Sequence, residues 1–416
     1  MGLLDRLEQR RPARIAAELT EVEDLRELID LAMGGPAASG ETVNVKRALE
    51  CPPVAAAVQV MGESVAQLPF RVFQNLGDRQ IEERPEHDVN ALLGSRGKPN
   101  EWQTPFEFFE QGTRDVALRG NFYAFKNLVA DRLRSLDRLV ADKVTVKQDD
   151  NFRIRYTVTT PGGGTRDLTS REIFHLRGPS DNGVAGNHVV KQMRHAIGLA
   201  LAQDKHASKL FANGARLSGW LEHPGVIGPE GTERLREAFE RIFGGADNAY
   251  KTAVFEEGMK FKEGSMTAEA AQLIESRTLQ RSVLAAIWRV PPHMIGDLEK
   301  ATFSNIEHLA RQFVDYALMP WLRRWEQAIG TQLLSDAERA AGLFVKLDPR
   351  GLLRGDSKAR ADFYTKGIAA TWLSPNEVRE KEDMPPRDGG DEFKNPNITA
   401  ADMADPDAPE GGRTDM

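Results

Sequence analysis

The clearest pattern of apolar positions lies between residues 266 and 330, and it predicts two long helices separated by a proline stop. In the first helix, over 266–290, residues of one face recur at steps of three and four: Leu273, Ile274, Arg277, Arg281, Leu284, Ala285 and Trp288. Pro291 and Pro292 end this helix, because proline cannot donate to the helical hydrogen-bond ladder and constrains the residue before it. A second helix is expected to begin near Ser304. On this pattern alone, an ordinary helical hairpin packed in a core is the simplest interpretation.

The stretch before residue 187 has the pattern of a mixed α+β domain. Apolar residues spaced four, three, four and three apart predict a helix over 46–67, followed by a strand after Pro69. Thr104-Pro105 with Glu107 is a capping box, which predicts a helix that begins there and ends at Gly120. Strand-like runs then recur at 121–128, 143–147, 152–159 and 173–176. These alternations indicate antiparallel strands.

A compact module is expected between two long helices. Residues 187–213 predict a helix rich in Ala and Gly, a composition that allows close approach of another helix. The following 52 residues, 214–265, read strand–helix–strand–strand before the helix over 266–290 begins. The helix is expected over 229–243, between a proline and a pair of glycines, and the strands at 217–221, 252–255 and 259–262. After the hairpin come a strand at 344–348, a helix over 356–366 and a helix from a second capping box at Ser374. An insertion of this kind between helical stalks is an unusual arrangement.

Composition restricts the classes of protein. The chain has 416 residues, 28% charged and 40% hydrophobic, which suits a folded protein of two or three domains. Its net charge of −7 argues against a protein that coats nucleic acid with a basic surface. Cys51 is the only cysteine, which excludes an intrachain disulfide and suits a reducing compartment. No apolar run approaches the length of a membrane span, so no membrane partner is expected.

Motifs of catalysis and cofactor binding are not found. The stretch 94–99 resembles a phosphate-binding loop, but Leu92 and Pro99 stand where that motif needs Gly and Ser or Thr. His188 and His195 are seven residues apart and could share a helix face, although a surface pair is the simpler interpretation. Carboxylates that converge in space could still form the two-metal site of a nuclease. We therefore expect no enzyme activity, cofactor or metal, and keep a metal-dependent nuclease as the alternative.

Several stretches, in order, resemble the HK97-type family of phage portal proteins. They run from about residue 45 to 386 and include ALECPPVAAAVQVMGESVAQLPFRVF, LRGNFYAF, IFHLRG, KLFANGARLSGWL, RVPPHMIG and LLRGDSKARADFYTKGIAATWLSPNEVREKEDMPP. No single stretch is specific, but the order and spacing together are. One departure is Trp288-Arg289, where the family often has Phe-Gly before Val-Pro-Pro. Gene transfer agents use portals of the same type, so the resemblance covers both kinds of particle.

The resemblance implies an α+β, multidomain portal-type subunit with long stem helices, an α/β clip, an α+β wing and a helical C-terminal crown. Mapped onto this sequence, the expected parts are a peripheral N-terminal segment (1–44), the wing (45–186 and 305–350), two stem helices (187–213 and 266–290), the clip (214–265), the tunnel loop (291–304), the crown (351–395) and a disordered tail (396–416). The tail is rich in Pro, Gly and Asp, a composition that buries too little apolar surface to fold.

The resemblance also implies function and partners. About twelve subunits would form a ring at one capsid vertex of the virion, through which double-stranded DNA is packaged and ejected. The ring would dock the terminase large subunit and a head–tail adaptor, sit within the major capsid protein shell, and assemble in the host bacterial cytoplasm. Another ring component, such as a head–tail adaptor, is a rival interpretation, although adaptors are typically much shorter than 416 residues.

Within this scheme, particular side chains have expected roles. If 291–304 lines the channel, Lys300 is the expected phosphate contact, or it pairs with a nearby acid on a solvated turn. The other expected loop residues are two neutral contacts or helix caps and two acids that repel phosphate: Thr302, Ser304, Asp297 and Glu299. The expected apolar anchors of the clip, which would carry subunit and motor contacts, are Trp220, Phe255 and Phe261.

Overall fold

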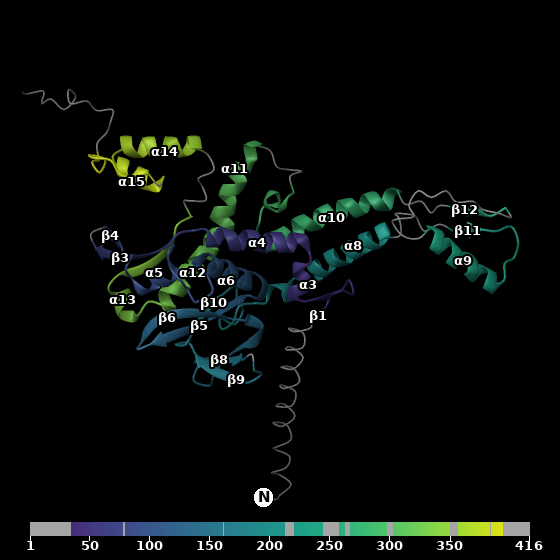
Figure 1. Cartoon of the computed structure of the whole chain (residues 1–416), viewed down its shortest axis with the longest axis horizontal. Coiled ribbons are helices and arrows are strands. Elements are labelled where there is room, and N and C mark those ends of the chain that lie inside the picture. Colours follow the sequence, from purple (N-terminus) through teal and green to yellow (C-terminus); the bar gives the residue numbers. More distant parts are fainter. Residues whose placement is uncertain are drawn as a thin grey trace, which may run out of the picture. The chain divides into compact units, whose positions relative to one another are not determined.

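The computed structural model describes residues 35–77, 80–160, 162–212, 220–243, 258–262, 267–297, 303–349, 357–382 and 384–393 (Figure 1). The chain divides into two compact units, Met1–Asp348 and Pro349–Met416. The first unit contains helices and antiparallel sheets, as the α+β prediction requires. Among its described residues, the second contains two helices. Within the described residues, none of the helices combines the length and the apolar character that crossing a membrane requires.

The described chain begins with a small β-ribbon against a helix that comes much later in the sequence. Strands β1 (Gly35–Pro36) and β2 (Thr42–Val43) pair antiparallel. Gly198 packs so tightly against Ala37 that a Cβ there would clash. Lys205 Nζ also binds Glu41 Oε1 at 2.7 Å. Residues 35–44, which were expected to be peripheral, are therefore integrated into the fold, while the rest of the 1–44 segment lies outside the described residues.

The helix expected over 46–67 is in fact two helices. Helix α3 (Val45–Leu49) ends one turn before α4 (Pro52–Ala66) begins. The break follows from Pro52 and Pro53, which fit the first turn of a helix but not its interior. The predicted apolar seam of α4 is confirmed, because Val54, Val58 and Met61 are fully buried.

Three antiparallel sheets form the body of the first unit. The first has the order β13-β3-β4, the second β10-β5-β6 and the third β7-β8-β9. Their strands are β3 (Phe70–Gly77), β4 (Gln80–Glu83), β5 (Asn121–Val129), β6 (Arg132–Leu139), β7 (Val144–Gln148), β8 (Ile154–Thr159), β9 (Thr165–Thr169), β10 (Ile173–Arg177) and β13 (Leu343–Leu347). Strand β13 pairs with β3, which lies far earlier in the sequence, with Leu343 opposite Gln74 in the register. Late residues therefore complete a sheet begun by early ones.

Helices α5 (Asp88–Leu93), α6 (Pro105–Arg119), α12 (Met319–Gln332) and α13 (Asp336–Ala340) belong to the same body. The capping box predicted at Thr104 is present, with both of its hydrogen bonds to Glu107. Trp325 of α12 is fully buried and stacks on Phe174 of β10, with its ring nitrogen 3.0 Å from Thr113 Oγ1. Other aromatic rings of this core are Phe108, Phe109 and Phe122. The core thus joins α6, the central sheet and α12.

The long helices differ from the prediction in two places. The helix expected over 187–213 begins as α7 (Val189–Gln192), breaks at Met193 and continues as α8 (Arg194–Ala212). The helix expected from Ser304 is α11 (Phe303–Gln312), which passes through a π-helical segment, η4 (Phe313–Leu318), into α12. Pro320 lies just after η4, and a π-helical turn relieves the clash of a proline ring with the carbonyl four residues earlier.

The remaining elements of the first unit are α9 (Pro229–Phe243), strands β11 (Trp220–Glu222) and β12 (Lys260–Lys262), α10 (Thr267–Ile287) and the 3₁₀ helix η3 (Pro292–Ile295). In the second unit, α14 (Ser357–Ala369) precedes α15 (Pro375–Lys381). The capping box predicted at Ser374 is present there. Phe363 and Trp372 pack edge to face with ring centroids 5.0 Å apart. The tail expected to be disordered, 396–416, lies outside the described residues.

Candidate functional site

Helices α8 and α10, the two predicted stem helices, form an antiparallel pair (Figure 1). Gln203 donates to Ser276 Oγ at 2.8 Å, and Arg277 binds Asp204 at 2.7 Å. Further along, Gln280 donates to the carbonyl of Ala196 at 2.8 Å. Polar side chains thus join the two helices at several levels, although more than 50 residues separate the helices in the sequence.

The end of α10 is fixed to the body of the unit. Trp288 is buried, and its ring nitrogen donates to the carbonyl of Ala117 in α6 at 2.9 Å. Arg289 has φ +57°, the left-handed conformation that glycine adopts most easily. Glycine adopts this conformation without strain, which explains why it suits the second position of the Phe-Gly pair that the family often has before Val-Pro-Pro. Pro291 and η3 then set the base of the predicted tunnel loop.

The structure describes only part of that loop. Gly296 has φ +87°, so the chain turns sharply after η3. Asp297 follows and is only 8% exposed, so its carboxylate is less available to a phosphate than the sequence suggested. Ser304 lies in the first turn of α11. Three of the expected loop residues lie outside the described residues: Glu299, Lys300 and Thr302. Their roles stay predictions.

The inserted module is described through β11, α9 and β12. Trp220 lies opposite Lys262 and Leu221 opposite Phe261 in the antiparallel β11–β12 ladder. Glu222 and Lys262 form an ion pair at 3.0 Å. Helix α9 has the bounds that the sequence predicted, with a proline at its start. Phe255, and the strand predicted around it, lie outside the described residues. Two of the three expected clip anchors therefore belong to one small sheet.

The segment that leads into α7 meets the sheet β10-β5-β6 at a crossing of glycines, which we call the junction. Gly120 ends α6 with φ +76°, and its carbonyl accepts a hydrogen bond from the amide of Gly178 at 2.7 Å. A Cβ on Gly120 would lie inside van der Waals contact with the carbonyl of Asn187, and one on Gly186 would clash with the carbonyl of Gly120. Gly120 of LRGNFYAF and Gly178 of IFHLRG, each the last residue of an LRG triplet, therefore lie in contact just before the chain enters α7.

Asn121 holds this crossing from the sheet side. Its Oδ1 accepts from the amide of Gly186 at 2.6 Å, and its Nδ2 donates to the carbonyls of Gly186 and Arg119. The same Oδ1 lies 3.0 Å from Nε2 of His175, and Nδ1 of His175 lies 3.2 Å from the Tyr156 hydroxyl. Because Oδ1 is an acceptor, Nε2 carries a proton. Burial lowers the pKa of His175 to about 3, with the nearby Arg177 acting in the same direction.

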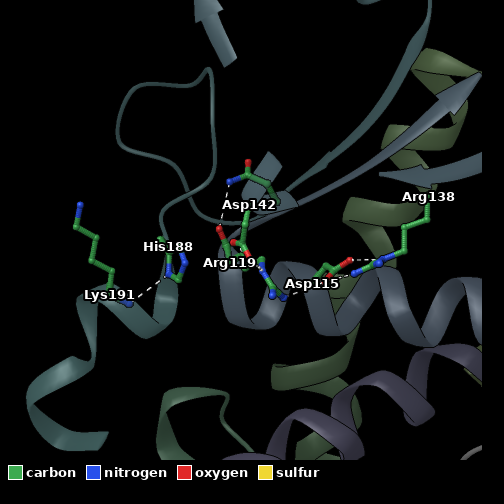
Figure 2. A network of polar contacts seen from close by, with 7 residues as sticks. Asp115, Arg119, Arg138, Asp142, His188 and Lys191 are labelled. Atoms are coloured by element: carbon green, nitrogen blue, oxygen red, sulfur yellow. Dashed lines mark hydrogen bonds and ion pairs between the residues drawn. The ribbon is translucent and has the colours of Figure 1, made fainter. Parts of the chain in front are cut away.

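A second polar network lies along α6 (Figure 2). Asp115 is 3% exposed, and its carboxylate accepts hydrogen bonds from Nε and Nη2 of Arg138 at 2.7 and 3.0 Å. Arg119 donates to Asp115 at 3.2 Å and to both oxygens of Asp142 at 2.8 and 2.9 Å. A buried carboxylate needs such charged donors, because an unpaired one would be expensive to desolvate. The network therefore fixes α6 to β6 and to the turn before β7.

The two histidines noted in the sequence have separate structural contacts. His188 precedes α7 and accepts from the amide of Lys191 at 3.2 Å (Figure 2). Burial lowers the pKa of His188, while the carboxylate of Asp142 acts in the opposite direction. His195 accepts from the amide of Ala38 at 3.0 Å. Among the described residues, no three His, Cys, Asp or Glu side chains converge as a metal site would require.

Comparison with known proteins identifies the family to which this chain belongs. A family model described as "Phage portal protein" matches residues 52–383. The chain belongs to the phage portal protein family. It is 32% identical over 375 residues to the probable portal protein of Streptomyces phage phiC31, across 86% of this chain and 80% of the relative. It is 30% identical over 357 residues to the portal protein of Enterobacteria phage HK97, across 84% and 82%.

The fold agrees with this assignment. A chain from the neck of a native gene transfer agent particle, solved with C12 symmetry, superposes with a TM-score of 0.53 and 25% identity. The match covers 80% of this portal chain and 91% of that one. As a portal protein, the chain has its place at a capsid vertex and its role in DNA packaging.

Sequence reasoning missed the residues that build the junction. Asn121, Asp115 and Arg138 were not singled out, because each is an ordinary polar residue in its own element. Their importance arises from partners that lie up to 65 residues away in the sequence, as for Asn121 and Gly186. The capping glycine Gly120 was the one signal that pointed to this place.

Proposed function

We propose that about twelve copies of this chain close into a ring whose central channel carries double-stranded DNA into and out of a capsid. The observation that carries the proposal is the family match over 52–383, supported by the likeness to a neck chain solved with C12 symmetry. In this ring, α8 and α10 are the stem helices and 291–304 is the tunnel loop. The ring is structural and non-enzymatic, and its place is the virion, assembled in the bacterial host.

The remaining parts acquire roles within the same proposal. The body formed by the three sheets and α12 is the wing, and the unit that contains α14 and α15 is the crown, with the tail 396–416 dispensable for ring formation. The inserted module, 214–265, is the clip that docks the terminase large subunit. The ring also contacts the major capsid protein and, after packaging, a head–tail adaptor. The net charge of −7 per chain supports a channel that does not hold DNA statically.

Deletion of the clip tests the docking role. Replacing residues 214–265 with a short Gly-Ser linker should leave the wing folded, because its buried aromatic core lies in other elements. The variant should keep its near-ultraviolet circular dichroism and lose binding to the terminase large subunit. Terminase binding at the parent's affinity would show that the motor docks elsewhere. Cleavage of double-stranded DNA by the purified parent with Mg²⁺ or Mn²⁺ would instead favour a nuclease.

A further inference from the structure

The α8–α10 pair has an exposed apolar patch on one side. Leu199 of α8 is 45% exposed, and Leu279 and Val283 of α10 are 66% and 43% exposed. The hydrogen bonds that join Gln203 to Ser276 and Gln280 to Ala196 fix the register of the antiparallel helices. In that register, Leu199 lies at the level of Leu279, and Val283 is one turn further along α10. The three side chains therefore form a single patch, which we call the stem knob.

A cavity of about 360 Å³ opens on the other side of the same pair. Its walls come from the start of α4, from both stem helices and from η3 at the base of the tunnel loop. Apolar wall residues include Cys51, Pro52, Ala56, Ala200 and Leu284. Polar side chains complete the lining: Gln203, Asp204, Arg277, Gln280 and Arg281. The cavity, which we call the stem cavity, has room for several apolar side chains.

The helix geometry places the stem knob and the stem cavity on different sides of the pair. Leu199, Leu279 and Val283 each precede a residue that lines the stem cavity: Ala200, Gln280 and Leu284. One residue along an α-helix is a rotation of about 100°. Because the two helices run antiparallel, the same rotation in both turns the exposed residues toward the same side, away from the cavity. The knob and the cavity also lie at the same level along the pair.

This arrangement fits a heterologous contact between copies of the chain. In a cyclic ring, one surface of each subunit meets a different surface of the next. Rotation about the ring axis leaves the height of every residue along that axis unchanged, so two surfaces that meet must lie at the same height. With the helix pair aligned along the ring axis, the stem knob and the stem cavity meet both requirements.

The geometry points to insertion of the stem knob, led by Leu279, into the stem cavity of the neighbouring copy. The inference rests on the ring proposed above and names a contact that closes it. The occupant is a second copy of this chain, because one chain supplies both a projecting apolar patch and a recess whose walls include apolar residues on α4, α8 and α10. Since Ile295 and Gly296 line the cavity, each copy would also contact the base of its neighbour's tunnel loop.

Cross-linking of the full chain tests the contact directly. In a Cys51→Ser background, Ala56→Cys in the cavity wall is combined with Leu279→Cys, and assembled protein is treated with a short bis-maleimide. The double variant should give a covalent ladder that extends beyond the dimer toward the full ring. Each single-cysteine variant should stop at monomer or dimer, because it offers only one of the two surfaces. Rings that are visible in micrographs but give no ladder beyond that of the single variants would overturn the inference.

Leu279→Glu provides an independent readout. Leu279 is two-thirds exposed, so the variant should keep the parent's far-ultraviolet circular dichroism while native mass spectrometry shows a shift from ring to monomer. Ile81→Glu makes the same kind of change at a residue that is 60% exposed on β4, and should keep the ring. Intact rings of Leu279→Glu would mean that another component of the particle covers the knob. If the parent itself forms no ring, the proposed function fails rather than this contact.

Discussion

Gly120→Ala should destabilise the chain far more than a glycine substitution in an open turn. Gly120 has φ +76°, and a Cβ there would overlap the carbonyl of Asn187 at the crossing between α6 and the stem. Gly163 is a matched control, because its φ is +82° but no atom lies within 4 Å of its would-be Cβ. Both substitutions impose the same left-handed strain, and only one imposes the clash.

The structure sets the expected magnitudes. A non-glycine residue in the left-handed region costs about 1 kcal/mol, so Gly163→Ala should lower the free energy of unfolding by about that amount. At Gly120 the clash adds to this strain, because Asn187 is itself held by a hydrogen bond from its amide to the carbonyl of Pro179 at 2.7 Å. A backbone held in this way cannot simply yield, and the total cost should reach about 3 kcal/mol or more.

Urea unfolding at one fixed protein concentration measures both variants. Tryptophan fluorescence is a suitable probe, because Trp325 is fully buried in the core that contains α6. We expect a small shift of the unfolding midpoint for Gly163→Ala and a shift several times larger for Gly120→Ala. Equal shifts would refute the close crossing of the backbone at Gly120.

Three further predictions concern single side chains. Burial holds the pKa of His175 near 3 against an ordinary value of 6.5, so the unfolded chain binds the extra proton between these values and stability falls as the pH drops through that window. Between pH 7 and pH 5 the parent should therefore lose about 2 kcal/mol more than His175→Gln in urea titrations. Arg289→Gly should raise the free energy of unfolding by about 1 kcal/mol by relieving its positive φ, and Arg289→Ala, which keeps the strain, should give no gain in the same titration. Lys300→Ala should assemble rings normally but alter DNA packaging or retention, measured as packaged DNA per particle; lost rings would make the loop structural, and unchanged packaging and retention would remove Lys300 from the channel.

Local signals in the sequence predicted many elements well. The capping boxes at Thr104 and Ser374 are both present, because they depend on residues within one helical turn. The bounds of α9 were also correct, since a proline marks its start and a pair of glycines follows its end. The two-part wing came from the family resemblance and stays a prediction, although β13 does pair with β3.

Other features depend on tertiary contacts that no local pattern reveals. The strand β6 has the sequence RLRSLDRL, whose charges hide its strand character, and it is a strand because it pairs with β5. The break between α3 and α4 follows from Pro52, a local signal that the prediction of one helix overlooked. The junction depends on Asn121 and on the meeting of Gly120 with Gly186, which only the folded chain brings together.

Electron microscopy of the purified full chain tests the central claim most directly. The account predicts closed rings with an open central channel, and a native mass of about twelve times the 46.2 kDa of one chain. A monomer that remains stable at high concentration in several buffers, with no rings in the micrographs, would contradict it.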